Sequence, residues 1–213
     1  MLNIDQIISQ TKHLKQVSLP GKKIHHSIMD SAVREAIFKN VNYSGAPQPA
    51  AVLALLYPNA DKEAHMVFIL RKTYKGHHSG QISFPGGKFE VTDKSLQQTA
   101  LREAYEEIGI ETENVQIIRK LTPVFIPVSN FNVTPFLAVC QQPVSFIKDK
   151  TEVEKILEIP LQKILLAPLI DIEHDYFGTT YRLKSFDIDG LRIWGATAMI
   201  LAEIRALLLS VLT

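Results

Sequence analysis

The stretch that decides the fold begins at Phe84-Pro85-Gly86-Gly87 and ends at Arg102-Glu103-Ala104-Tyr105-Glu106-Glu107-Ile108-Gly109. Ser95 and Gln98 have the spacing of a capping box, and Gly109 is typical of the residue just beyond a helix end. We therefore predict a helix over residues 95–108. At about 100° per residue, its three glutamates share one face. Its apolar residues share the opposite, core-facing side: Leu101, Ala104, Tyr105 and Ile108.

The three clustered glutamates Glu103, Glu106 and Glu107 disfavour the helix that carries them. Like charges three or four residues apart repel, and the negative end of the helix dipole lies nearby. Some cation must compensate, and two candidates stay open: a divalent metal, or Lys and Arg partners on a solvated face. Hard carboxylate oxygens suit Mg²⁺ or Mn²⁺. The Gly86-Gly87 pair would let backbone approach a ligand closely.

Composition bounds the class of protein. The chain has 213 residues, 46% of them apolar, and a formal net charge of +1. This balance argues against a nucleic-acid-binding protein, which usually carries a basic excess. A single cysteine, Cys140, excludes an internal disulfide, follows an apolar run and is expected to be buried. The first 19 residues lack the apolar block of a secretory signal, so we expect a cytoplasmic protein.

Two segments flank a predicted domain over residues 46–213. Residues 1–45 read as a helical extension, with one helix holding Ile4, Ile7, Ile8 and Leu14 and a second over residues 31–38 with Val33, Ile37 and Phe38 inward. The prolines of residues 44–49 predict a linker. Residues 196–212 are apolar but interrupted by Glu203 and Arg205. They predict an amphipathic helix packed on the body, next to a core Trp194, and no membrane span.

Strands and helices are interleaved between these segments. Strands are predicted at residues 50–57, 65–71, 115–121 and 133–139, the first two central, with a short extended piece at 81–84. A short helix should start near Pro160, and a hairpin should turn at Asp189-Gly190. The alternation is irregular, which favours an α/β fold with a mixed sheet and helices on both faces.

The decisive stretch resembles the Nudix box. The residues that fit its pattern are Gly87, Arg102, Glu103, Ala104, Glu106, Glu107, Gly109 and Ile110. Asp93 stands where the pattern expects its first Glu, and the gap from Gly87 to Arg102 is one residue longer. These departures resemble the coenzyme A pyrophosphatase branch. So do an upstream motif from Leu70-Arg71 through His78 and Gly80-Gln81 to Gly87, residues 129–136, and Ile159-Pro160-Leu161; Lys72 and Lys75 depart from that upstream motif.

The resemblance implies a Nudix-like α/β/α sandwich with extra N-terminal and C-terminal helices. It also implies a hydrolase that uses Mg²⁺ or Mn²⁺ to cleave coenzyme A or a derivative into 3′,5′-ADP and a 4′-phosphopantetheine product. The implied metal ligands are Glu103, Glu107, Glu106 and the Gly87 carbonyl, with Arg102 orienting the acidic residues. Glu152 is a further metal ligand or base, or else a solvated loop residue.

Substrate contacts are expected from Arg71, Lys75, His78 and Gly86. Arg71, Lys72 and Lys75 form a basic group that could receive the 3′-phosphate of coenzyme A, or that could simply be solvated. Two other functions stay open. One is a Nudix hydrolase for ADP-ribose, a dinucleoside polyphosphate or an oxidised nucleotide, and the other is a catalytically silent binding module. The partner is a small molecule, without nucleic acid or membrane, and the N-terminal helices could build a homodimer.

Overall fold

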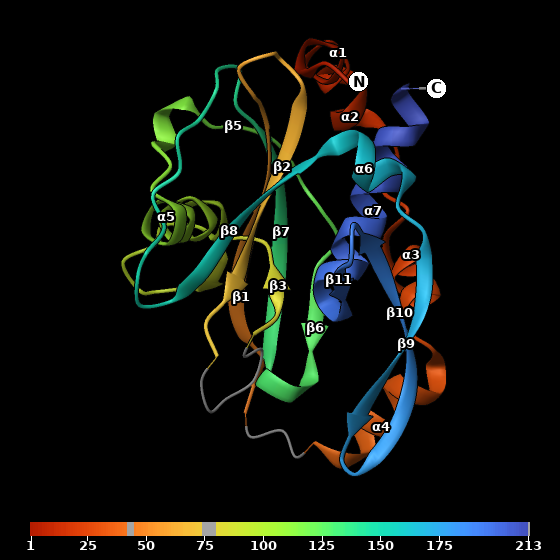
Figure 1. Ribbon diagram of the computed structural model, residues 1–213. Coiled ribbons are helices and arrows are strands. Elements are labelled where there is room, and N and C mark those ends of the chain that lie inside the picture. The colour runs from red at the N-terminus through yellow and green to blue at the C-terminus, as the bar shows by residue number, and fades with distance from the viewer. Residues whose placement is uncertain (42–44, 74–79, 213) are drawn as a thin grey trace.

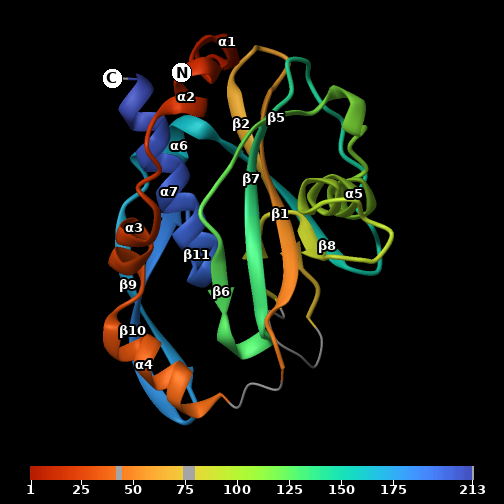
Figure 2. The same cartoon turned by 180° about the vertical axis from the view of Figure 1, so that it is seen from behind.

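The computed structural model describes residues 1–41, 45–73 and 80–212. Two predicted substrate contacts, Lys75 and His78, lie outside these residues. A central sheet stands between two helical layers (Figure 1). α5 (Leu96–Ile108) covers one face, and α7 (Gly195–Leu212) covers the other together with the N-terminal helices (Figures 1 and 2). The predicted α/β/α sandwich is confirmed.

The central sheet is mixed, as predicted. Its strands are β1 (Gln48–Pro58), β2 (Ala64–Arg71), β3 (Ile82–Ser83), β4 (Gly86–Lys88), β5 (Gln116–Lys120), β6 (Val124–Ile126), β7 (Phe131–Val139) and β8 (Val153–Pro160). The order is β3-β2-β1-β7-β5, with β4 on β1, β6 on β7 and β8 on β2. β1 and β7 run parallel, while β1 pairs with β2 and β4 in antiparallel fashion.

A second, three-stranded sheet lies beside the C-terminal helix. It consists of β9 (Leu169–Tyr176), β10 (Thr179–Ile188) and β11 (Leu191–Trp194). The predicted hairpin at Asp189-Gly190 joins β10 to β11. The remaining helical elements are α1 (Ile4–Ser9), α2 (Thr11–Gln16), α3 (Gly21–Ile28), α4 (Ser31–Asn40), η1 (Thr112–Asn114), η2 (Pro127–Ser129) and α6 (Leu161–Leu166).

β1 divides the core into two halves because side chains alternate across a strand. Ala51, Leu53 and Leu55 pack with Ala100, Ala104 and the other buried residues of α5. Ala54 and Leu56 pack on the other face with α1, α2, α3 and α7. The strand is buried on both faces, as its apolar run predicted.

α7 is the one helix in the described ranges that is long and apolar enough to cross a membrane by length and composition. Here it packs against the sheet and α3, with Leu201, Ile204 and Leu207 in the core. It therefore lies on the body as predicted. Glu203 is not on a polar face, however, because its side chain is fully buried.

Three further predictions about burial are wrong. Tyr105 and Phe38 are 54% and 47% exposed. Each side chain lies outside the buried face of its helix. That face includes Ala104 and Ile108 in α5, and Val33 and Ile37 in α4. Trp194 is half-buried at the end of β11 and lines a cleft instead of joining the main core.

Strand boundaries also differ from the expectations. Pro49 belongs to β1, where its missing N–H is tolerated near the start of the strand. β8 and β9 were not predicted. The alternation of apolar and charged residues in β9 is an ordinary strand signal that was overlooked.

The buried charge of Glu203 joins the first and last parts of the chain. Its carboxylate lies 3.2 Å from the His25 imidazole of α3 and accepts a 2.6 Å hydrogen bond from the Thr122 hydroxyl. Burial alone would raise the pKa of Glu203, but the hydrogen bonds from His25 and Thr122 outweigh it, so the pKa is lowered. A carboxyl group with a lowered pKa stabilises the fold above its unfolded-state pKa, and this contribution is lost in acid.

We predict that Glu203→Gln lowers the free energy of unfolding at pH 7 by about 2 kcal/mol, the scale of a charged hydrogen bond. The difference from wild type should shrink as the pH falls below 4.5, the ordinary pKa of a Glu side chain. Urea unfolding at several pH values measures both effects. Glu35→Gln, on the exposed side of α4, is the control and should change little. A pH-independent difference would contradict the prediction.

Candidate active site

The helix that carries the acidic residues is capped as predicted. The Ser95 hydroxyl accepts a 3.2 Å hydrogen bond from the Gln98 amide. The Gln98 side chain caps the Lys94 amide at 2.8 Å rather than the Ser95 amide. At the other end Gly109 is left-handed, with φ 69°, and its amide bonds the Tyr105 carbonyl. These local contacts fix where the three glutamates lie.

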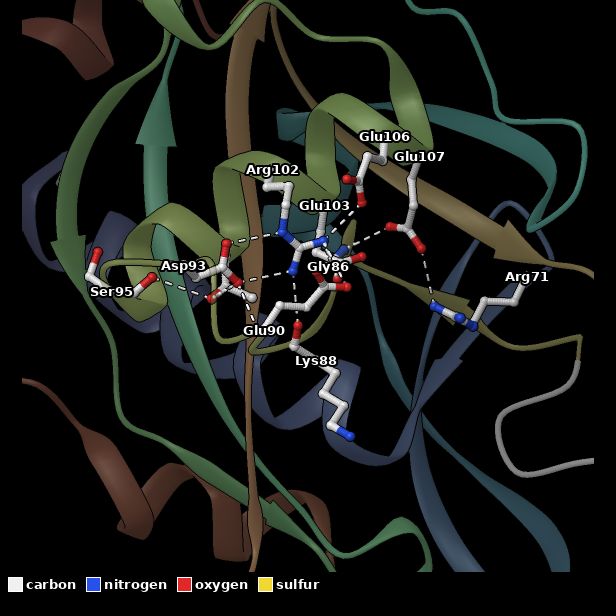
Figure 3. Close-up of polar contacts among 11 residues, drawn as sticks. Arg71, Gly86, Lys88, Glu90, Asp93, Ser95, Arg102, Glu103, Glu106 and Glu107 are labelled. Carbon is white, nitrogen blue, oxygen red and sulfur yellow. Dashed lines mark hydrogen bonds and ion pairs between the residues drawn. The ribbon is translucent and has the colours of Figure 1, made fainter.

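Glu107 is buried against Gly86 at the start of β4 (Figure 3). The Gly86 amide donates a 2.7 Å hydrogen bond to its carboxylate, and the Arg71 guanidinium lies 3.4 Å away. Burial raises the pKa of Glu107 to about 8, against the opposing effects of Gly86 and Arg71. The charges of Glu103 and Glu152 raise it further. In the absence of a metal ion the Glu107 carboxyl therefore largely holds its proton at neutral pH, because the surrounding protein would compensate its negative charge only in part.

Arg102 is the centre of the polar network in Figure 3. Its guanidinium lies 3.0 Å from the Asp93 carboxylate, 3.0 Å from Glu103 and 2.9 Å from Glu106. It also donates to the Lys88 carbonyl. The hydrogen bond from Arg102 holds the pKa of Asp93 at about 2, which keeps this buried partner ionised. Arg102 therefore pairs with three carboxylates at once; that it orients them for catalysis stays a prediction.

Glu103 lies directly over Gly87. A Cβ atom on Gly87 would meet the Glu103 carboxylate at 2.5 Å, so only glycine permits this approach. Burial raises the pKa of Glu103, although Arg102 opposes the shift. The Gly-Gly pair was predicted to allow close approach to a ligand; here its backbone also sits against two carboxylates.

Glu152 is exposed, but it lies close to the same carboxylates. Its charge raises the pKa of both Glu103 and Glu107, and it lines the same cleft. Its loop is fixed to the end of α5, because the Asp149 amide bonds the Glu107 carbonyl at 3.0 Å. The Asp149 carboxylate in turn accepts hydrogen bonds from the Thr151 and Glu152 amides. Sequence reasoning missed Asp149, although the Asp-x-Thr spacing is typical of such a turn.

A cleft of about 1110 Å³ opens above these residues. Its acidic end is lined by Arg71, Gly86, Gly87, Arg102, Glu103, Glu106 and Glu152. Glu107 lies beneath this surface. Lys72 of the predicted basic group is instead held to the Glu152 loop, where its ammonium donates to the Lys150 carbonyl. The described site residues of the sequence prediction thus line this end of the cleft, except Glu107, which lies beneath it.

The acidic end of the cleft offers the kinds of oxygen donor that divalent cations bind. Glu103, Glu107 and Glu152 offer carboxylate oxygens, and Gly87 offers a carbonyl, which are ligands that Mg²⁺ and Mn²⁺ accept. Within residues 1–41, 45–73 and 80–212, no three acidic, His or Cys side chains converge as a ready metal site. Two arginines compensate the carboxylates instead. Arg102 pairs with Glu103 and Glu106, and Arg71 pairs with Glu107.

The two glycines should respond differently to a methyl group. In Gly86→Ala the new Cβ would lie 2.3 Å from the Ala51 carbonyl oxygen of β1, at a φ of 152°, and neither backbone can yield. In Gly87→Ala it would meet the end of the Glu103 side chain, which can turn away. We expect Gly86→Ala to cost several kcal/mol of stability, about 3 or more, and Gly87→Ala about 1 or less. Thermal unfolding of both variants measures this, and equal losses would contradict the assignment.

The raised pKa of Glu107 predicts a pH-dependent stability in the presence of a chelator. An acid whose folded-state pKa is raised contributes stability below its unfolded-state pKa, and this is lost as the pH rises through the folded value. Chelated wild type should therefore lose stability between pH 4.5 and about 8. Glu107→Gln should lack this component, because its neutral amide needs no counter-charge. Parallel pH profiles for the two proteins would show that Glu107 is not destabilised by burial.

The chain matches known proteins along this same region. The family model described as NUDIX domain matches residues 47–177. "Nudix hydrolase 15, mitochondrial" of Arabidopsis thaliana is 33% identical over 162 residues, which cover 73% of this chain and 56% of that protein. The "Uncharacterized Nudix hydrolase NudL" of Pectobacterium atrosepticum is 35% identical over 135 residues, which cover 60% of this chain and 66% of that protein. The match thus spans less than two thirds of each relative.

Solved structures share the fold. RenU, a Nudix hydrolase from M. Smegmatis, superposes with a TM-score of 0.55 at 16% identity, over 78% of this chain and 89% of that chain. A MutT/nudix family protein from Enterococcus faecalis superposes with a TM-score of 0.52 at 13% identity. The superposition covers 92% of this chain and 76% of that chain. Because the family model covers more than half of the sequence and includes α5 with its glutamates, this chain belongs to the Nudix hydrolase family.

Proposed function

We propose that this protein hydrolyses the diphosphate bond of coenzyme A or a derivative, giving 3′,5′-ADP and a 4′-phosphopantetheine product. The observation that carries the proposal is the cluster of Glu103, Glu107 and Glu152 around Gly86-Gly87 at one end of a large cleft. A carboxylate buried with incomplete compensation is costly to a fold, and such groups concentrate at functional sites. The family of the chain acts on diphosphate bonds.

The residues have separate roles in this proposal. Glu103, Glu107, Glu106 and the Gly87 carbonyl would hold Mg²⁺ or Mn²⁺, which when bound supplies Lewis-acid stabilisation of the charge on the diphosphate oxygens. Arg102, anchored by Asp93, orients Glu103 and Glu106. Glu152, exposed beside them, would accept a proton from an attacking water. The Arg71 guanidinium lines the cleft and can pair with a phosphate oxygen.

Two features favour coenzyme A over a smaller diphosphate. The sequence from Arg71 to Gly87 and residues 129–136 resemble the coenzyme A pyrophosphatase branch, and Arg71, Ser129, Phe131 and Val133 line the cleft. The cleft volume of about 1110 Å³ also lies at the upper limit of ordinary ligand sites, roughly 300–1,000 Å³. A long, bulky substrate makes better use of such a space than a mononucleotide.

We predict that with added Mg²⁺ the protein converts coenzyme A to 3′,5′-ADP, identified by mass spectrometry. Glu107→Gln should lower kcat by about 100-fold or more. The loss of a residue that only supports the metal ligands already costs about 10- to 100-fold, and the loss of a direct ligand should cost more. The fold should persist, since the amide oxygen of Gln can still accept the Gly86 N–H. Glu113→Gln, on the exposed η1 turn outside the cleft, is the matched control.

Other outcomes would select the rival functions. Turnover of ADP-ribose, a dinucleoside polyphosphate or an oxidised nucleotide without release of 3′,5′-ADP from coenzyme A would defeat the proposed substrate. Binding of these compounds without any turnover would indicate a silent binding module. Unchanged rates in Glu107→Gln would show that the metal assignment is wrong.

A further inference from the structure

The cleft continues well beyond the acidic end. Its other end is walled by α3 and α4, which precede the region matched by the family model. Besides His25, which is paired with Glu203, three basic side chains line it there: Lys22 and His26 from α3 and Arg34 from α4. Sequence analysis did not single them out, although Lys22 and His26 stand four residues apart and so share one helix face.

These three basic residues lie close together, and Lys22 and Arg34 bring positive charge to the His26 imidazole. Partial desolvation lowers the pKa of the His26 imidazole, and the nearby charges of Arg34, His25 and Lys22 lower it further. In the described part of the chain, none of the three forms an ion pair with an acidic residue. Asp175, which also lines the cleft, accepts instead from the Thr180 hydroxyl. Uncompensated like charges at a cleft wall favour an anionic ligand.

Aromatic rings lie in the same cleft. Phe38 of α4 and Phe125 of β6 have ring centroids 6.0 Å apart, and both line the cleft. Phe38 is 47% exposed, unusual for so large an apolar group. Phe177, 52% exposed, lines the cleft from the β9–β10 turn with a left-handed φ of 55°, a strained conformation for an aromatic residue. Aromatic faces of this kind stack nucleobases.

Strands β1 and β7 of the central sheet lie between the two ends of the cleft. Gly87 of β4 pairs with Ala51 of β1, β1 pairs with β7, and Val133 of β7 pairs with Val124 of β6. Three strand spacings therefore separate β4 from β6, about 14 Å. Figure 2 shows β1, β7 and β6 side by side between α5 and α3. Side chains reach into the one cleft from both sides of this span, so a ligand with anionic groups at two positions can contact both ends.

We propose that Lys22, His26 and Arg34 bind a phosphate monoester carried on the ribose of the substrate, and that Phe38 and Phe125 contact its base. The subsite would select a 3′-phosphorylated nucleoside. It rests on the proposed function only in one respect, that the scissile diphosphate binds at the acidic end of the cleft. Specificity would then come from helices outside the family-matched region, while the acidic residues of α5 lie inside it.

Binding in the presence of a chelator tests the subsite without turnover. Trp194, the single tryptophan of the sequence, lines the cleft, so its fluorescence reports ligand binding. Wild type should bind adenosine 3′,5′-bisphosphate about tenfold or more tighter than adenosine 5′-monophosphate, the effect of a charge-assisted hydrogen bond. The double variant Lys22→Gln, Arg34→Gln should bring this ratio to about one. Lys23→Gln, exposed on α3 but outside the cleft lining, is the matched control and should keep it.

Phe38→Leu should weaken both adenosine ligands to a similar extent, because it removes a ring and no charge. Equal affinity of wild type for the two ligands, or a ratio that survives the double variant, would overturn the phosphate subsite. An unchanged affinity in Phe38→Leu would overturn the contact with the base. A preference for the bisphosphate in a protein that does not hydrolyse coenzyme A would reject the proposed function and support the subsite.

Discussion

The 2.7 Å hydrogen bond from the Gly86 amide to the buried Glu107 carboxylate is the constraint on which the rest of the site depends. Gly86 is pressed onto β1 so closely that no side chain fits, which fixes β4 at the edge of the core. The bond ties α5 to that edge. Glu103 is thereby held over Gly87, and the loop of Glu152 is held at the end of α5. One buried carboxyl group thus sets the positions of a strand, a helix and a loop.

Local signals predicted this part of the molecule well. The Ser95 and Gly109 caps fixed α5 to within one residue, and the two-sided apolar runs of β1 and β2 fixed the centre of the sheet. Long-range packing decided what could not be predicted. Helical periodicity alone could not show that Glu203 is buried, because its partners His25 and Thr122 come from distant segments. Tyr105 was placed inward because the core stripe of α5 is narrower than its apolar residues suggest.

The acidic half of the candidate site could be predicted from the sequence, whereas the basic half could not. The difference lies in how the residues of each half are distributed along the chain. The glutamates lie within one helix, so their spacing alone places them together. Lys22, His26 and Arg34 belong to two short helices near the N-terminus. The packing of α3 on α7 and of α4 on β10 brings them to the cleft. His25 reaches inward to Glu203 while its neighbour His26 faces the cleft. The buried pair therefore also fixes the orientation of the cationic helix face.

The formal net charge of +1 conceals this separation of charges along the cleft. An end rich in carboxylates repels a diphosphate unless a cation binds there, whereas the end with Lys22 and Arg34 attracts phosphate directly. A substrate with anionic groups at both ends would therefore bind first through α3 and α4. It would engage the acidic end only when a divalent cation is present. Such an order makes productive binding depend on the metal, although the nucleoside end needs none.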